Sequence, residues 1–185
     1  MKIDEYNRVL EILCYRLRET IDPKTLIENI RKSCSPATTQ LLDADTIAGN
    51  RHLFFATLNA MKRFVQGRAF SHSLDVEILL SVSTQKQIEE AVRMNGIRRQ
   101  TKNIAIVLVA DSTEIAKSAV QKLESLISGD RDQTVLDRID KKKIGHLIRS
   151  FGISCAEFEA LTGKSDAEKV EWLIVERTAI LDTKR

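Results

Sequence analysis

The sequence predicts an α/β protein of the α+β type, in which a small mixed sheet of about four strands packs with about eight helices. Short apolar segments alternate with amphipathic helical segments early and late in the chain, as in β-α-β units. Consecutive helical segments interrupt this alternation from about residue 46 to residue 100. The length of 185 residues suits one domain. We therefore expect a single domain over residues 1–185, built from split β-α-β units with a helical insertion.

The first predicted β-α-β unit occupies the first 44 residues. The segment 8–17, RVLEILCYRL, has the apolar and aromatic content of a strand. In the following DPKTLIENIRKSC, Asp22 suits the N-cap of a helix and Pro23 suits its first position. A Ser-Pro pair ends that helix, and TTQLLDA at 38–44 predicts a second strand.

The predicted insertion begins with a helix over about 47–66, which Gly67 ends. The next segment, 74–82, is ambiguous because its apolar residues alternate as in a strand, whereas Ser73 is a good helix N-cap. We expect a short helix there, with a strand as the alternative. A further helix over 85–94 completes the insertion.

The second β-α-β unit begins with NIAIVLVAD at 103–111, which is apolar on both faces and should be the central strand. A helix from near Ser112 to Gly129 and a strand at 134–139 follow. Three helices are expected in the remainder, over residues 140–151, 154–163 and 167–182.

The composition indicates a cytoplasmic protein without a membrane partner. No run of about 18 apolar residues is present, and the N-terminal segment differs from a signal peptide. The three cysteines are far apart and odd in number, which favours free thiols over a zinc site or a disulfide framework.

The sequence contains no recognisable catalytic motif, and we expect neither a cofactor nor a metal site. His52, His72 and His146 are not spaced as metal ligands. One alternative stays open: Asp111 follows the central strand, where α/β enzymes place catalytic groups, and could act with a histidine on an anionic metabolite. Asp111 could equally be a simple helix cap.

Positive charge is concentrated in the middle of the chain. Residues 47–103 carry nine Lys/Arg against four Asp/Glu, although the net charge of the whole chain is only +3. Cations interleaved with an aromatic residue on one helix face suit single-stranded RNA, since cations bind phosphates and planar groups stack on bases. An ordinary solvated helix face is the alternative. The candidate RNA-binding residues are Arg51, His52, Lys62, Arg63, Arg68, His72, Arg98 and Arg99.

The C-terminal helix carries more apolar residues than one core-facing stripe requires. A helix that is apolar on two sides buries the second side against a partner, or else completes the core. Arg177 lies among these apolar residues, as is typical of an interface hot spot. The candidate partner-binding residues are Val170, Ile174, Arg177, Ile180 and Leu181.

Four segments occur in an order and spacing that a known family shares. They are DADTIAGNRHLFFATLNAMKRF, SLDVEILLSVSTQKQIEEAVRMNGI, IAIVLV and IVERTAIL. Together they resemble the kinase-binding subunit of the KEOPS complex (the TPRKB family), and we expect an archaeal member. The similarity covers about residues 41–182, and the first forty residues match only in outline.

The resemblance implies a non-catalytic adaptor in a complex that makes threonylcarbamoyladenosine in tRNA. Another subunit of that complex performs the transfer, and a small kinase/ATPase subunit assists it. A member of this family binds the small kinase and, in archaea, helps to recruit tRNA through its single-stranded 3′ end. The kinase would then be the partner of the C-terminal helix, and Glu77 would order the junction of the inserted helices.

Overall fold

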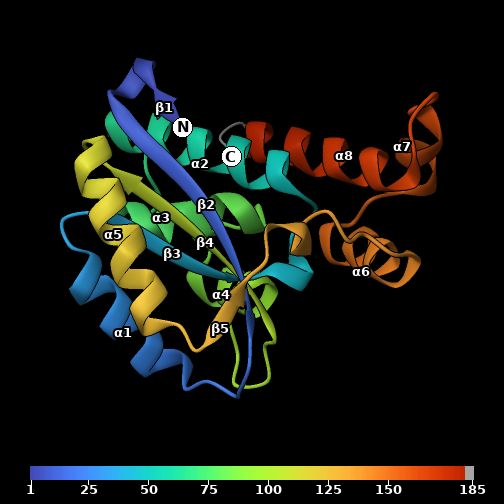
Figure 1. Cartoon of the computed structure of the whole chain (residues 1–185). Coiled ribbons are helices and arrows are strands. Elements are labelled where there is room, and N and C mark those ends of the chain that lie inside the picture. Colours follow the sequence, from blue (N-terminus) through green and yellow to red (C-terminus); the bar gives the residue numbers. More distant parts are fainter. Residues whose placement is uncertain (182–185) are drawn as a thin grey trace. The chain divides into compact units, whose positions relative to one another are not determined.

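The computed structural model describes residues 1–181, which form two compact units (Figure 1). The first unit contains residues 1–44 and 96–135, and the second contains residues 45–95 and 136–185. The predicted insertion over 46–100 therefore supplies the first segment of the second unit. Each unit is described separately below.

A sheet of five strands forms the centre of the first unit. The strands are β1 (Lys2–Ile3), β2 (Arg8–Leu17), β3 (Thr38–Asp43), β4 (Asn103–Ala110) and β5 (Gly129–Arg131).

The sheet has the order β1-β2-β4-β3, and β5 pairs with the C-terminal end of β2, whereas β1 pairs with its N-terminal end. Each described pair is antiparallel, for example Leu13 opposite Ile106 and Leu41 opposite Ile106. Since β2 and β3 both run antiparallel to β4, they run parallel to each other with β4 between them. This is the split β-α-β arrangement that the sequence predicts, and β4 is central as expected from its apolar composition.

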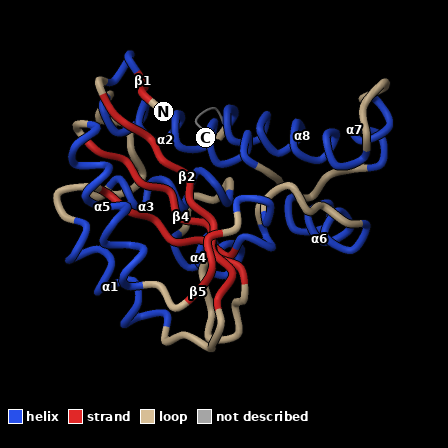
Figure 2. The backbone as a smooth tube through the Cα atoms, in the orientation of Figure 1, coloured by secondary structure: helices blue, strands red, loops and turns tan. Residues whose placement is uncertain are grey.

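Two helices cover one face of this sheet, namely α1 (Pro23–Cys34) and α5 (Thr113–Leu126) (Figures 1 and 2). The side chains of Ile30 on α1 and Leu123 on α5 are fully buried against Leu13, Ile106 and their neighbours. Asp22 caps α1 as predicted by accepting a hydrogen bond from the Thr25 backbone N–H at 3.2 Å.

The second unit is helical. Its helices are α2 (Asn50–Val65), α3 (Leu74–Ser83), α4 (Ile88–Asn95), α6 (Lys141–Phe151), α7 (Cys155–Ala160) and α8 (Asp166–Ile180). Helix α2 packs against both α3 and α8, and α8 also packs against α6. Residues 74–83 are helical, so the favoured prediction for this ambiguous segment is confirmed and the strand alternative is wrong.

The α+β fold class is confirmed, but two features of the predicted sheet are wrong. The described strand pairs are antiparallel rather than mixed. Residues 134–139 form a short 3-10 turn over Gln133–Val135 and irregular structure, whereas the strand lies earlier, at Gly129–Arg131. Gly129 is required there because a Cβ atom would lie 2.6 Å from the carbonyl oxygen of Arg16 on the paired strand.

Candidate nucleic-acid interface

Helix α3 is almost entirely buried although its first turn carries two acidic residues, Asp75 and Glu77. Every side chain from Glu77 to Ser83 is buried. A carboxylate in such surroundings is destabilising unless a cation and hydrogen-bond donors compensate for its lost hydration. The neighbouring helix α2 supplies that cation.

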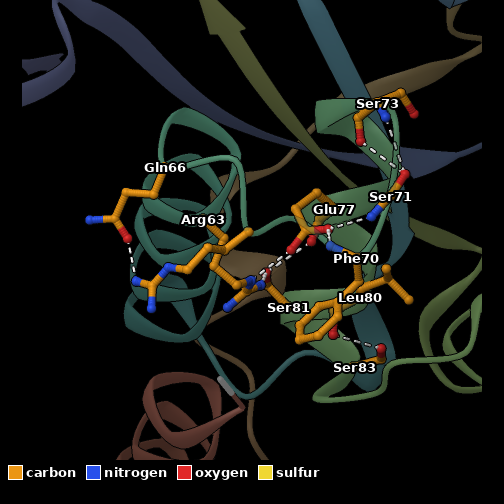
Figure 3. A network of polar contacts seen from close by, with 10 residues as sticks. Arg63, Gln66, Phe70, Ser71, Ser73, Glu77, Leu80, Ser81 and Ser83 are labelled. Carbon is orange, nitrogen blue, oxygen red and sulfur yellow. Dashed lines mark hydrogen bonds and ion pairs between the residues drawn. The ribbon is translucent and has the colours of Figure 1, made fainter. Parts of the chain in front are cut away.

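The compensating cation is Arg63, whose side chain is 1% exposed beside a fully buried Glu77 side chain. Arg63 Nε donates to Glu77 Oε1 at 2.6 Å, and its guanidinium also donates to the Ser81 hydroxyl (Figure 3). Ser81 in turn donates to the Glu77 carbonyl oxygen at 2.8 Å. The pair therefore joins α2 to α3 in the interior of the second unit.

The second carboxylate oxygen of Glu77 fixes the backbone of the 66–73 loop, which connects α2 to α3. Glu77 Oε2 accepts hydrogen bonds from the backbone N–H groups of Phe70 at 2.9 Å and Ser71 at 3.1 Å. At the other end of the loop, the Arg68 N–H donates to the Arg63 carbonyl oxygen at 2.9 Å. The buried ion pair thus determines the conformation of an otherwise exposed segment (Figure 3).

Phe70 occupies the middle of the 66–73 loop and is 39% exposed. The Arg63 guanidinium carbon lies 5.3 Å from the centre of the Phe70 ring, and Lys86 Nζ lies 5.2 Å from it. Both distances are within the range of cation–π attraction, which favours a defined position of the ring. An exposed aromatic ring with a defined position is a stacking surface for a nucleobase.

The same part of the unit carries several exposed basic side chains. Lys62 at the end of α2, Arg68 and His72 in the 66–73 loop, and Lys86 before α4 are all exposed. Cations around an aromatic ring can bind the phosphates of an RNA strand whose base stacks on that ring. Of these residues, sequence analysis missed Phe70 and Lys86. A lone aromatic residue in a Gly-Ser-rich connection between helices was the available signal.

Two of the predicted RNA-binding residues are buried, and their assignment is corrected here. The structure places Arg63 in the interior ion pair, so its side chain supports the loop instead of lying on an exposed face. His52 is fully buried: its Nδ1 accepts from the Ala48 N–H at 3.2 Å, and its Nε2 lies 2.9 Å from the Val82 carbonyl oxygen. Burial lowers the pKa of His52 to about 4, so the ring is neutral at pH 7.

The other predicted RNA-binding residues are exposed and are divided between the two units. Arg51 lies at the start of α2, where its backbone N–H donates to Glu171 Oε1 at 3.0 Å and its guanidinium lies over Trp172. Lys62, Arg68 and His72 lie at or beyond the opposite end of that helix. Arg98 and Arg99 belong to the first unit, in the connection that precedes β4.

The predicted partner-binding face of α8 is for the most part core. Val170 and Ile174 are fully buried, and they pack with Leu147, Phe151 and other residues of the same unit. Leu181, just after α8, is only 2% exposed. The second apolar side of α8 is covered because this helix packs against both α2 and α6. The prediction that these three side chains face a partner is therefore wrong.

Arg177 is likewise an internal contact, and its assignment as an interface hot spot is corrected. Its guanidinium donates to the carbonyl oxygens of Phe151 at 3.1 Å and Gly152 at 3.2 Å, at the C-terminal end of helix α6. It also donates to Glu157 Oε1 on α7 at 2.9 Å. The hydrogen bonds from Ser154, together with the nearby Arg177 charge, lower the pKa of Glu157 to about 2. Arg177 thus joins α8 to α6 and α7.

Three of the exposed apolar side chains lie near the C-terminal ends of α2 and α8, whereas Ile88 and Val92 are exposed on α4. Helices α2 and α8 run in the same direction, since Arg51 contacts Glu171 near their starts and Asn59 Nδ2 donates to Thr178 Oγ1 at 3.1 Å further along. Ile180 is 39% exposed, whereas Phe64 and Val65 are 38% and 71% exposed. Of the five predicted partner-binding residues, Ile180 alone has a substantially exposed side chain.

The described residues show no grouping that suggests catalysis. Asp111 is exposed and forms an ion pair with Arg8, while Ser112 and not Asp111 caps α5. Over residues 1–181, no group of His, Cys, Asp and Glu side chains is arranged to hold a metal ion. In the same part of the chain, no helix has the length and apolar character needed to cross a membrane.

Comparison with known proteins adds independent information. The family model described as "Kinase binding protein CGI-121" matches residues 18–182. The regulatory protein Cgi121 of Methanocaldococcus jannaschii is 30% identical over 117 residues, which cover 61% of this chain and 72% of the relative. The EKC/KEOPS complex subunit CGI121 of Coccidioides immitis is 30% identical over 81 residues, which cover 44% of this chain.

These matches differ in how much of each relative they include. The chain matches only 39% of the Coccidioides protein and 51% of the corresponding Schizosaccharomyces pombe subunit, to which it is 27% identical. The relatives come from an archaeon and from fungi, so the expected archaeal origin is not established. The family description states kinase binding and the name of the archaeal relative states regulation, in agreement with the predicted non-catalytic role. Since the family model spans most of its length, the chain belongs to the CGI-121 family of kinase-binding proteins.

Proposed function

We propose that this chain is an adaptor subunit of a KEOPS complex, where it binds the small kinase/ATPase subunit and the single-stranded 3′ end of tRNA. The 66–73 loop and Lys86 would hold the RNA. The observation that carries the RNA part of this proposal is Phe70, an exposed ring with two cations within about 5.3 Å of its centre. The family description and the names of the relatives support the kinase part.

The buried ion pair preorganises the loop that forms the proposed RNA site. An exposed loop ordinarily loses conformational entropy when it binds a ligand, which weakens binding. Here the Glu77 carboxylate holds the amides of Phe70 and Ser71 in place before any ligand arrives. The ring of Phe70 is therefore preorganised, and a base that stacks on it gains affinity without having to order the loop.

The surrounding charges suit a single strand better than a duplex. Base stacking on Phe70 requires an unpaired base, and such stacking contributes about 1–3 kcal/mol per base. Arg68, His72 and Lys86 are close in sequence or space to the ring and can contact the phosphates on either side of that base. A 3′ end that is single-stranded meets both requirements.

Titration of a fluorescently labelled single-stranded RNA ending in CCA tests the RNA proposal. Replacing Arg68 and Lys86 together with Ala should weaken binding and lower the slope of log affinity against log salt by about 1.4, since each phosphate contact contributes about 0.7 for a single strand. The control is the Lys117→Ala, Lys122→Ala double variant on α5, which removes two exposed charges from the first unit. An equal loss in both double variants would indicate non-specific attraction and contradict the proposed site.

The kinase interaction is proposed to use the exposed apolar residues at the ends of α2 and α8, with Ile180 as the central contact. An Ile180→Asp variant should no longer co-purify with the small kinase subunit, because a carboxylate would be buried without a partner. Val92→Asp on α4 is the matched control, since Val92 is 47% exposed and lies on a different helix. Retention of the kinase by Ile180→Asp, with the fold intact by circular dichroism, would place the kinase site elsewhere.

A further inference from the structure

A second basic feature of the helical unit is separate from the 66–73 loop. It is a cavity of about 550 Å³ beside α6, which the RNA proposal does not use. The lining residues are Asp45, Thr46, Arg138, Asp140, Lys142, Lys143, His146 and Arg149. Four of these eight residues are Lys or Arg, and one more is a histidine, so the cavity concentrates cations in a concave space.

Three basic residues form a row along one side of α6. Lys142, His146 and Arg149 are spaced by four and three residues, which places them on one face of the helix. At a rise of 1.5 Å per residue this row extends over about 10 Å. Several positive charges spaced along such a line can bind several negative groups of one ligand at once.

The two acidic residues of the cavity only partly offset this charge. The Asp140 side chain caps α6 by accepting from the Lys143 backbone N–H at 2.7 Å, so it also neutralises part of the helix dipole. Asp45, before α2, is exposed and also lines the cavity. Among the described residues, no ion pair joins Lys142 or Arg149 to a carboxylate, and both side chains are exposed.

We infer that this α6 cavity binds closely spaced phosphate groups. Arginine and lysine are the usual ligands of phosphate oxygens, and Arg149 can donate two parallel hydrogen bonds to one phosphate. The ligand would be either the phosphodiester backbone of an RNA or the phosphate chain of a nucleoside triphosphate, since both present adjacent negative groups. Its volume lies within the range of small-ligand pockets.

The cavity and the 66–73 loop lie at opposite ends of α2. Thr46 precedes α2, and Phe151 at the end of α6 makes an edge contact with His52 in the first turn of α2, with ring centres 5.6 Å apart. The loop begins just after Val65, at the other end of this 16-residue helix. The helix is about 24 Å long at 1.5 Å per residue, so the two sites are separated by about this distance and can be tested independently.

The test compares the full wild-type chain with the Lys142→Ala, Arg149→Ala double variant in isothermal titrations. The three probes are sodium tripolyphosphate, ATP without added metal, and an RNA duplex that lacks any single-stranded 3′ end. We expect tripolyphosphate affinity to fall on the order of tenfold or more, because two charge-assisted contacts are lost. The Lys117→Ala, Lys122→Ala variant removes the same charge elsewhere and should bind as the wild type does.

The arms of the experiment identify the source of the phosphate. A parallel loss of duplex RNA affinity assigns the cavity to an RNA backbone, whereas a loss with ATP alone assigns it to a nucleotide. If tripolyphosphate fails to bind the wild type, or binds the double variant equally well, the inference is overturned. The CCA-ending single strand is a separate probe, so failure of the 66–73 loop as an RNA site would be recognised independently.

Discussion

The buried ion pair between Arg63 and Glu77 predicts a large loss of stability when one partner is neutralised. In a Glu77→Gln variant the side chain keeps its size, but the buried Arg63 guanidinium loses the negative charge that lies 2.6 Å from its Nε. The amide also has one oxygen where the carboxylate has two, and the carboxylate accepts from Arg63, Phe70 and Ser71. Its NH₂ group would have to face one of these donors.

The magnitude follows from the burial of both side chains, which are 1% and 0% exposed. Removing one partner of a fully buried pair costs about 3–5 kcal/mol, because the remaining charge is desolvated and uncompensated. That is a large fraction of the about 5–15 kcal/mol that stabilises a typical domain. Replacing both partners with apolar residues, as in Arg63→Met with Glu77→Leu, should cost less than the single change, since no charge then stays buried.

Urea denaturation followed by circular dichroism measures the loss, and hydrogen exchange of the Phe70 and Ser71 amides measures the release of the loop. The matched control is Glu90→Gln on α4, because Glu90 and Arg93 are also 2.6 Å apart but are 44% and 72% exposed. This exposed pair should contribute less than about 1 kcal/mol. A Glu77→Gln variant that loses no more stability than Glu90→Gln would refute the assignment of Glu77 as the residue that orders the loop.

Three further predictions follow from buried or constrained residues. Burial holds the pKa of His52 at about 4, so below pH 6.5 the unfolded chain binds a proton that the native chain does not. The free energy of unfolding should therefore fall by up to about 3 kcal/mol from pH 6.5 to about 4. A His52→Gln variant should lack this part of the pH dependence in urea titrations. Gly49 has a φ of +142° and a Cβ atom there would lie 2.3 Å from Glu171 Oε1, so Gly49→Ala should lower the unfolding free energy by about 1–3 kcal/mol, whereas Gly67→Ala, with open space around it, should cost less. Arg177→Met should lower the melting temperature by removing the hydrogen bonds that join α8 to the end of α6, while an unchanged melting temperature would show that these bonds contribute nothing.

The elements that sequence analysis located correctly have strong local signals. Asp22 with Pro23 marks the start of α1, and the apolar segment 103–111 coincides with central strand β4. Residues 134–139 are predicted as a strand because of their apolar and β-branched side chains. In the structure Val135 is buried, at 4% exposure, but it belongs to the 3-10 turn Gln133–Val135 and not to a strand. Such a segment has the amino-acid composition of a strand but does not pair with another strand.

The main difference between prediction and structure concerns α2, where His52 and Arg63 are expected on an exposed face but are buried. A helix that packs against α3 and α8 is buried over a wide arc, so its polar residues cannot be assigned to solvent by a single apolar stripe. His52, Ala56, Ala60 and Arg63 are spaced by four, four and three residues and are all buried. The two small alanines allow a neighbouring helix to approach closely, which encloses the polar residues at either end of this row.

Glu77 contained a signal that could have located Arg63. A carboxylate within the apolar run that begins at Val76 requires a buried cation, and the preceding helix ends with Lys62 and Arg63. The similar error at Arg177 arose because an arginine among apolar residues is typical of an interface and equally of a buried helix junction. Sequence spacing does not distinguish these cases, since both place a cation among apolar neighbours.

The central claim is that Phe70, positioned by the buried ion pair, is the stacking surface for the RNA 3′ end. Phe64 provides a control within the same unit, because it is 38% exposed and Phe70 is 39% exposed. The decisive measurement is the affinity of Phe70→Ala and Phe64→Ala for a single-stranded RNA ending in CCA. Phe70→Ala should bind on the order of tenfold more weakly than the wild type, as expected for one lost stacking contact, and Phe64→Ala should bind as the wild type does. Equal affinities of the two variants for this RNA would contradict the account.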